Sequence, residues 1–179
     1  AVLLHGPLRS VTDVHAPIEL KTGQGFFHRL GFVIGGRTYS LLQIENERIR
    51  DAFSDPRVHF VLNCASGSCP ALQPELPRGA GLEAYLDAAA KRFVADPQNV
   101  AVDHASRRIR LSTLFEWYRD DFLNDLRRRG RPAGGGLVAY LIDDAPDELR
   151  RELERARDYE VEFLDYDWSI NSAGGSGGG

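Results

Sequence analysis

Methionine is absent from this 179-residue chain, and lysine is nearly so. Without a methionine, Ala1 is not a start residue, so we expect that the natural N-terminal part is missing. The two lysines stand against 20 arginines, and the formal net charge of -4 gives no basis for a nucleic acid or an anionic membrane as partner. No stretch approaches the ~18 apolar residues of a membrane span, so none is predicted in this fragment.

Cysteine is also scarce, and both copies lie close together in RVHFVLNCASGSCP, as Cys64 and Cys69. A C-x4-C spacing without a second pair lacks the ligand set of a zinc finger, so neither a metal nor another cofactor is predicted. Two cysteines leave the redox compartment open, because a Cys64–Cys69 disulfide requires oxidising surroundings. The localisation is therefore open between cytoplasm and a periplasmic or secreted setting.

The same stretch predicts a reactive thiol at Cys69. Its alternating apolar residues indicate a strand with His59 and Asn63 on one face, and Pro70 indicates a helix that begins just after Ser68 or Cys69. A helix N-terminus favours the thiolate, and His59 is the nearest base in the sequence. Asn63 is a candidate to orient that imidazole or to donate a hydrogen bond to an oxyanion. The alternative is a buried structural cysteine beside a core histidine.

Two carboxylates complete the candidate catalytic set. Glu45 falls on the apolar stripe of a helix predicted over residues 40–53, where a carboxylate must be paired, neutral or functional. Asp167 follows a strand over residues 159–166 whose alternation changes phase near its end, which indicates a bulge or a polar pocket. Asp167 is a second candidate to orient the base.

The order of the predicted elements favours an α+β fold. Hairpins are predicted over 26–39 and 100–111, and helices over 40–53, 82–94, 113–122, 137–142 and 148–156. We expect a single domain over residues 1–171, with a small, mostly antiparallel sheet, several packed helices and a papain- or transglutaminase-like arrangement. The Gly/Ser-rich residues 172–179 read as a flexible tail.

Four motifs in order, YSLLQIENERIR, DPRVHFVLNCASGSCP, LSTLFEWYRDDF and YDWSIN, carry a family resemblance. The stretch from Leu3 to Asn171 resembles a bacterial-type member of domain of unknown function family 547. That family has no assigned activity, and its plant members replace the cysteine of the SCP element. The resemblance implies a bacterial source and a missing aromatic-rich N-terminal segment. It puts Trp117, Tyr118 and Trp168 on motif positions, and with Ser68 we predict them as binding residues.

Two functions follow from these residues. The first is a thiol-dependent hydrolase or acyltransferase that acts on an amide or thioester, with Cys69 as nucleophile and His59 as base. Glu45, Asn63 or Asp167 would orient the base. The second is a non-enzymatic module for a small molecule or peptide, in which a Cys64–Cys69 loop is structural.

Overall fold

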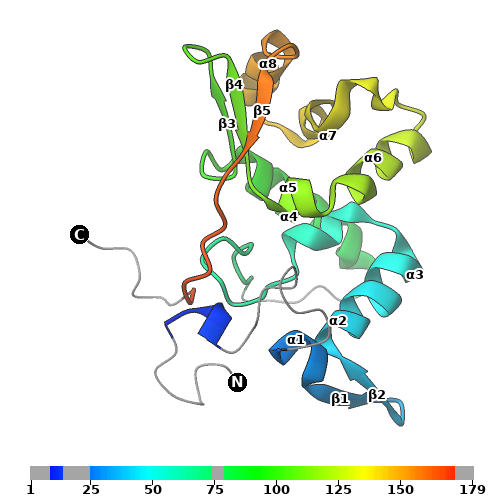
Figure 1. Ribbon diagram of the computed structural model, residues 1–179. Helices are drawn as coiled ribbons and strands as arrows, with labels where there is room; N and C mark the ends of the chain where they lie inside the picture. Colours follow the sequence, from blue (N-terminus) through cyan, green and yellow to red (C-terminus); the bar gives the residue numbers. More distant parts are fainter. Residues whose placement is uncertain (1–8, 14–24, 74–78, 172–179) are drawn as a thin grey trace. The chain divides into compact units, whose positions relative to one another are not determined.

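The computed structural model describes residues 9–13, 25–73 and 79–171 of the chain (Figure 1). It combines helices with short strands, which confirms the predicted α+β class. Two compact units are formed by interleaved parts of the chain: unit 1 comprises residues 1–54, 63–69 and 167–179, and unit 2 comprises residues 55–62 and 70–166. The predicted tail, 172–179, lies outside the described residues, and the papain- or transglutaminase-like arrangement stays a prediction.

Unit 1 contains the first predicted hairpin. Strands β1 (Gly31–Ile34) and β2 (Arg37–Ser40) pair antiparallel. The turn residues Gly35 and Gly36 have φ angles of 58° and 78°, which a Gly-Gly turn supplies without a Cβ clash. The first part of the predicted strand is instead the helical turn α1 (Phe26–Arg29).

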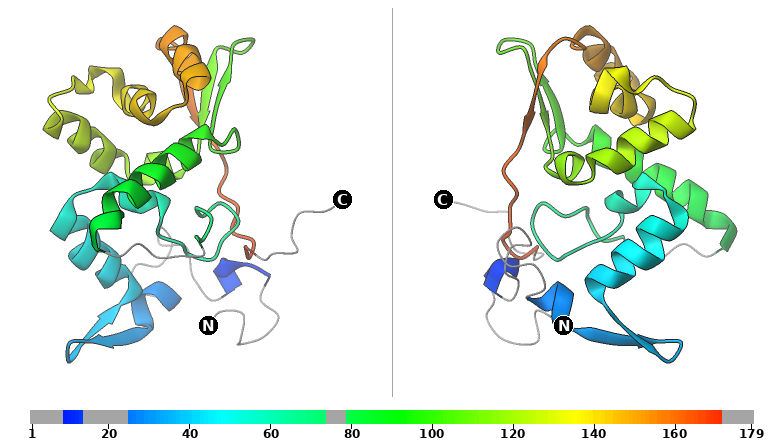
Figure 2. Two further views of the ribbon diagram at one scale, coloured as in Figure 1. Left: turned by 180° about the vertical axis from the view of Figure 1, so that it is seen from behind. Right: turned by 45° about the vertical axis from the view of Figure 1, so that its right-hand side comes forward.

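A continuous helix follows the hairpin, as the Ser40–Gln43 capping box predicts. The Gln43 N–H donates to Ser40 Oγ at 3.1 Å, and the Ser40 N–H donates to Gln43 Oε1 at 3.0 Å. The helix runs through α2 (Leu41–Gln43), the π-helical segment η3 (Ile44–Arg50) and α3 (Asp51–Phe53). Ser54 ends it in a left-handed conformation, with a φ of 51°. Figure 2 shows this helix and the hairpin from two further sides.

Unit 2 combines α-helices and short 3₁₀ turns with one sheet (Figures 1 and 2). Its helices are α4 (Leu82–Ala95), α5 (Leu114–Trp117), α6 (Arg119–Arg128), α7 (Gly136–Asp144) and α8 (Asp147–Arg155), with 3₁₀ turns η4 (Pro56–Phe60), η5 (Gly79–Gly81) and η6 (Ala133–Gly135). Strands β3 (Val100–Asp103) and β4 (Arg108–Leu111) form the second predicted hairpin, and β5 (Glu160–Phe163) joins β4 in parallel. A parallel neighbour requires a long crossover, which α5 to α8 provide.

An aromatic cluster fills the core of unit 2. The rings of Phe60 and Phe93 lie 4.9 Å apart, those of Phe115 and Phe122 lie 5.2 Å apart, and Tyr140 lies 4.9 Å from Phe122. All five side chains are buried. Such aromatic pairs contribute roughly 0.5–1.5 kcal/mol each beyond their buried area, so this cluster anchors η4 to the helices of the unit.

Two predictions around the cysteines are wrong. The alternation over residues 58–63 predicted a strand, but its first part lies in the 3₁₀ turn η4 (Pro56–Phe60), because Asp55 Oδ1 accepts the Arg57 N–H at 3.0 Å and Pro56 occupies the first position of the turn. No helix begins at Pro70 either: residues 70–73 are irregular, and α4 begins only at Leu82. His59 and Asn63 therefore share no strand face, and Cys69 caps no helix.

Candidate functional site

The two cysteines close a six-residue loop in unit 1. Cys64 and Cys69 form a disulfide, with their Cα atoms 6.3 Å apart, and both residues are partly exposed. We call residues 64–69 the disulfide loop. A free thiolate at Cys69, as predicted for a nucleophile, exists only when this bond is reduced.

The sulfur of Cys69 is surrounded by hydrogen-bond donors from within the loop. The Cys64 N–H donates to Cys69 Sγ with a distance of 2.9 Å. The hydroxyl of Ser66, a fully buried side chain, donates to the same sulfur at 3.3 Å and lies 3.0 Å from Cys64 Sγ. Hydrogen bonds to the charged form of a group favour that form, so the Cys64 N–H stabilises a thiolate at Cys69, while the single proton of the Ser66 hydroxyl is within reach of either sulfur. Ser66 was not among the residues predicted, and its only sequence signal is its place between the cysteines.

Asn63 and Ala65 shape the start of the loop. Asn63 Oδ1 accepts the Ala65 N–H at 2.7 Å, a local turn typical of asparagine. Ala65 has a φ of 68°, a left-handed conformation that is costly for a residue with a Cβ. The structure thus gives the Asn63 oxygen a positioning role in the loop, and its predicted role at an oxyanion or imidazole stays a prediction.

The disulfide loop is fixed from outside by residues 167–171. The Gly67 N–H donates to the Ser169 carbonyl at 2.8 Å, and the Asn171 N–H donates to the Ala65 carbonyl at 2.8 Å. The Asp167 N–H donates to Ser68 Oγ at 2.8 Å. These contacts bring four predicted residues of unit 1 into one neighbourhood, namely Ser68, Cys69, Asp167 and Trp168.

The opposite side of the same segment is paired as well. The Val11 N–H and the Ser10 hydroxyl both donate to the Trp168 carbonyl, at 2.9 and 2.8 Å, and the Ile170 N–H donates to the Arg9 carbonyl at 3.1 Å. Residues 167–171 are therefore hydrogen-bonded to residues 9–11 on one side and to the disulfide loop on the other. Any movement of the loop would break these backbone hydrogen bonds, so they restrain it.

Asp167 is an exposed carboxylate that orders this arrangement. Its Oδ1 accepts the Ser169 N–H at 2.9 Å, and hydrogen bonds from the Ser169 side chain and backbone hold the pKa of Asp167 below its ordinary value. A Cβ at position 67 would collide with the carboxylate of Asp167, so a larger residue there requires that side chain to move. Asp167 is thus ionised and in contact with the loop, as a partner of Gly67 and Ser169.

Glu45 lies on the π-helical segment η3 of unit 1 and is partly buried. The predicted stripe assumed α-helical spacing, and π turns rotate side chains differently. Phe53, the last residue of the expected stripe, is 71% exposed. The helix was predicted correctly and Leu42, Glu45 and Ile49 are partly buried, but the predicted stripe does not extend to Phe53. A catalytic role for Glu45 stays a prediction.

In unit 2, His59 is the centre of a buried pair. Its Nε2 lies 2.8 Å from Asp121 Oδ2, and its side chain is 1% exposed. Tyr118 stacks on the imidazole with a centroid distance of 3.6 Å, and Phe122 meets it edge-on at 5.8 Å. An aspartate that fixes a histidine in this way is found in catalytic sites and in polar cores alike. The role of His59 as base for Cys69 stays a prediction.

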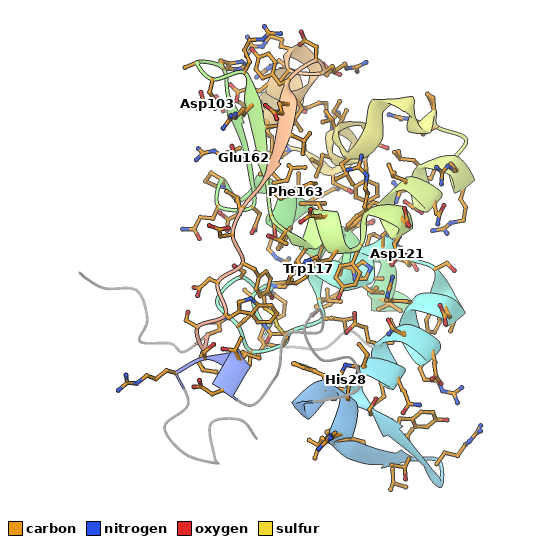
Figure 3. The ribbon with its side chains drawn as sticks, viewed as in Figure 1. His28, Asp103, Trp117, Asp121, Glu162 and Phe163 are labelled. Carbon is orange, nitrogen blue, oxygen red and sulfur yellow. A yellow bond between two sulfur atoms is a disulfide. The ribbon has the colours of Figure 1, made fainter. Side chains whose placement is uncertain are left out.

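Figure 3 labels Asp121 on α6 and Trp117 on α5. Trp117 contacts Tyr166, with ring centroids 4.6 Å apart. Asp121 was noted only as a motif position, because the 62 residues that separate it from His59 conceal their pairing in the sequence. The predicted binding residues Trp117 and Tyr118 thus belong to unit 2, while Ser68 and Trp168 belong to unit 1.

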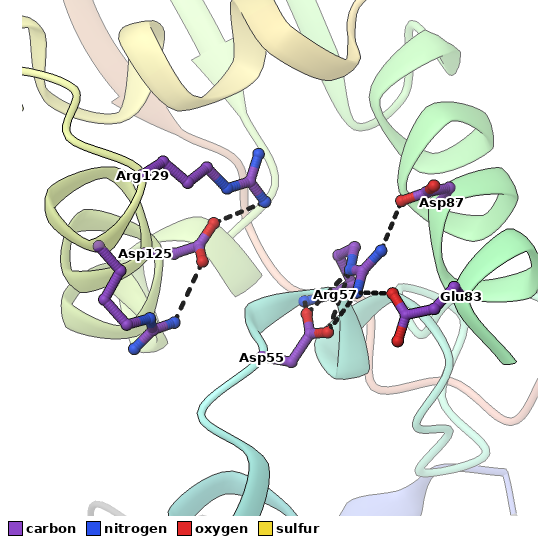
Figure 4. Close-up of polar contacts among 7 residues, drawn as sticks. Asp55, Arg57, Glu83, Asp87, Asp125 and Arg129 are labelled. Atoms are coloured by element: carbon purple, nitrogen blue, oxygen red, sulfur yellow. Dashed lines mark hydrogen bonds and ion pairs between the residues drawn. The ribbon is translucent and has the colours of Figure 1, made fainter.

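Unit 2 also holds a charged cluster that the sequence did not indicate (Figure 4). The Arg57 guanidinium contacts Asp55 at 2.5 Å, Asp87 at 2.5 Å and Glu83 at 2.7 Å. Burial alone would raise the pKa of Asp55, but the hydrogen bonds and charge of Arg57 outweigh it and hold that pKa below its ordinary value. Nearby, Asp125 pairs with Arg129 at 2.6 Å.

No group of three or more His, Cys, Asp or Glu side chains in the described part of the chain could hold a metal ion. Within residues 9–13, 25–73 and 79–171, no helix has the length and apolar character to cross a membrane.

One comparison with known proteins gives a match. A family model described as "Protein of unknown function, DUF547" matches residues 2–94, which is just over half of the chain. No curated protein and no solved structure matches at a significant level.

Proposed function

The chain belongs to the DUF547 family, and we propose that it is a thiol-dependent hydrolase or acyltransferase that acts on an amide or thioester. Its nucleophile would be Cys69, in the form in which the bond to Cys64 is reduced. One observation carries the proposal: the Cys69 sulfur accepts the Cys64 N–H at 2.9 Å and the Ser66 hydroxyl at 3.3 Å. These donors supply the thiolate stabilisation that a helix start was expected to give.

The proposed chemistry is acyl transfer through a thioester. The Cys69 thiolate attacks the carbonyl carbon of the substrate, and the carbonyl electron pair moves to oxygen. When this tetrahedral intermediate collapses, the carbonyl re-forms and the C–N or C–S bond breaks. The amine leaves after taking a proton from water, whereas the thiol leaves as a thiolate. Water or an acceptor nucleophile then cleaves the Cys69 thioester. Ser66 acts on the sulfur itself, and Asp167 acts as a positioning residue through Gly67 and Ser169.

Two single-cysteine variants test the thiolate directly, because the chain has only two cysteines. Cys64→Ser leaves Cys69 alone, and Cys69→Ser leaves Cys64 as a matched control. In the full chain, we expect the pH midpoint of iodoacetamide labelling for Cys69 to lie about one unit or more below that for Cys64 and below ~8.5. Adding Ser66→Ala should move the Cys69 midpoint up, because one donor is lost.

The acyl step is tested with S-phenyl thioacetate on the same variants. The expected result is an acetyl adduct on Cys69 in the Cys64→Ser protein, with release of thiophenol, and a markedly slower reaction at Cys64 in the Cys69→Ser protein. Equal adduct formation at the two positions, together with coincident labelling midpoints, would refute the proposal.

A non-enzymatic binding module is the second candidate, and the Cys64–Cys69 disulfide itself favours it. In that function the bond is structural and neither thiol is activated, so both single-cysteine variants should label with a midpoint near ~8.5. Closure of a loop of this size is worth roughly 2 kcal/mol, so the variant without cysteines should lose about that much stability and keep its fold. A small molecule or peptide stays the predicted ligand.

A further inference from the structure

We propose that Cys64 and Cys69 form a reversible dithiol–disulfide couple that exchanges with low-molecular-weight thiols. An incoming thiolate would attack Cys64, and Cys69 would leave as the thiolate. The exchange itself is independent of acyl transfer. Its consequence, that oxidation locks the nucleophile and reduction releases it, rests on the proposed function.

Opening the disulfide would leave the loop in place, because other bonds hold it. The Cys69 N–H donates to the Ser66 carbonyl at 3.1 Å within the loop, and the Gly67 N–H donates to Ser169 at 2.8 Å outside it. Asp167 adds its backbone bond to Ser68 Oγ at 2.8 Å. With the backbone fixed on both sides, the two sulfurs stay near each other after reduction. The bond can therefore re-form without a search through open conformations.

A backbone donor on the Cys69 sulfur sets the direction of exchange. The Cys64 N–H donates to Cys69 Sγ at 2.9 Å, and the Ser66 hydroxyl is within hydrogen-bond distance of both sulfurs. The Cys64 N–H thus stabilises Cys69 as the leaving thiolate. The thiol with the lower pKa leaves faster in thiol–disulfide exchange, so attack at Cys64 is the favoured route.

The exchange balances in two steps with a thiol as the reductant. In the first, the thiolate sulfur bonds to Cys64 Sγ, the Cys64–Cys69 bond breaks, and its electron pair goes to Cys69. In the second, another thiolate attacks the external sulfur of the mixed disulfide, which releases Cys64 as a thiolate and the small molecule as its disulfide. Both residues are partly exposed, so each step has a sulfur within reach of solvent.

The test uses the oxidised full chain in glutathione buffers, without any acyl substrate. Samples are quenched with N-ethylmaleimide, and adducts are located by peptide mass mapping. We expect full reversibility under native conditions, with the mixed disulfide on Cys64 in at least tenfold excess over Cys69. Ser66→Ala should slow reduction about threefold for each unit by which it raises the pKa of Cys69. Ser106→Ala, in the turn between β3 and β4, is a control without effect.

Reduction that requires denaturant, failure to reoxidise, or a mixed disulfide mainly on Cys69 would overturn the inference. If the couple is reversible but reduced Cys69 forms no acetyl adduct, the acyl-transfer proposal fails alone. If Cys69 is acylated in the Cys64→Ser protein but the wild-type disulfide does not exchange, only the redox inference fails.

Discussion

Replacing Arg57 by methionine tests how the charged cluster stabilises unit 2. Arg57 is 14% exposed at its side chain and contacts one half-buried carboxylate and two exposed ones. Methionine keeps much of the length and apolar stem of arginine but removes the guanidinium. Asp55, Glu83 and Asp87 then face one another without the shared cation.

The expected loss of stability comes mainly from Asp55. Removing one partner of a buried ion pair costs roughly 3–5 kcal/mol, whereas exposed pairs contribute about 0.2–1 kcal/mol. Asp55 is 24% exposed, so its contact belongs near the lower end of the buried range, while Glu83 and Asp87, at 75% and 54% exposed, follow the surface range. We therefore expect Arg57→Met to lower the free energy of unfolding by about 3 kcal/mol at neutral pH.

The loss should depend on pH with a defined sign. Arg57 depresses the pKa of Asp55 in the folded state, so its contribution is present above the ordinary pKa of aspartate and is lost as the pH falls towards the folded value. In the variant, only the charge of Arg129 still opposes the effect of burial on Asp55, so the pKa of Asp55 rises and acid becomes less unfavourable to the folded state. The stability difference between the two proteins should therefore shrink as the pH falls through the ordinary pKa of aspartate, ~3.9, towards the lower folded-state value of Asp55.

Urea unfolding followed by tryptophan fluorescence measures this difference unit by unit. The chain has two tryptophans, Trp117 in unit 2 and Trp168 in unit 1, so a Trp168→Phe background reports unit 2 alone. Arg155→Met is the matched control: Arg155 is 67% exposed, lies 3.7 Å from Glu152, and should cost less than about 0.5 kcal/mol. A loss that is equal for both variants, or that stays constant across the pH range, would refute the electrostatic explanation.

Two further substitutions test close packing and buried polarity. Gly67→Ala should destabilise unit 1 by about 1 kcal/mol, measured through Trp168 in a Trp117→Phe background, because the new Cβ would displace the Asp167 carboxylate from the Ser169 N–H. In an Asp167→Ala background the same substitution should cost little, and simple additivity would contradict the contact. Tyr140→Phe should leave the free energy of unfolding unchanged or raise it by up to about 1 kcal/mol, because the buried Tyr140 hydroxyl has no hydrogen-bond partner among the described residues. A decrease of more than about 1 kcal/mol in urea unfolding would contradict this.

Local signals predicted the fold well where neighbours in the sequence decide it. The Ser40–Gln43 capping box and the Gly35-Gly36 turn act within a few residues, and both are present as predicted. Around His59, alternation suggested a strand, but the cap from Asp55 and the ring of Pro56 favoured a 3₁₀ turn. There the competing signal was also local and was given too little weight.

Long-range pairings were beyond local reasoning. Strands β4 and β5 pair in parallel, with Ile109 opposite Val161, although four helices separate them in the sequence. Nothing in the sequence of either strand indicates which strand it pairs with. At the candidate site, Asp167 lies beside the cysteine loop, a contact across 99 positions that the sequence could not show. The change of phase after Phe163 coincides with the end of β5. The donors on the Cys69 sulfur could not be predicted, because they depend on the fold of the loop itself.

The backbone bond between Asp167 and Ser68 has a consequence for synthesis of the chain. These residues are separated by 99 positions. A ribosome that adds ~5–20 residues per second needs roughly 5–20 s to make that stretch. During this interval the nascent chain carries Cys64 and Cys69 without the segment that later pins their loop. Both thiols are then open to oxidants, to metals and to other chains, so residues 167–171 protect the cysteines as well as pin their loop.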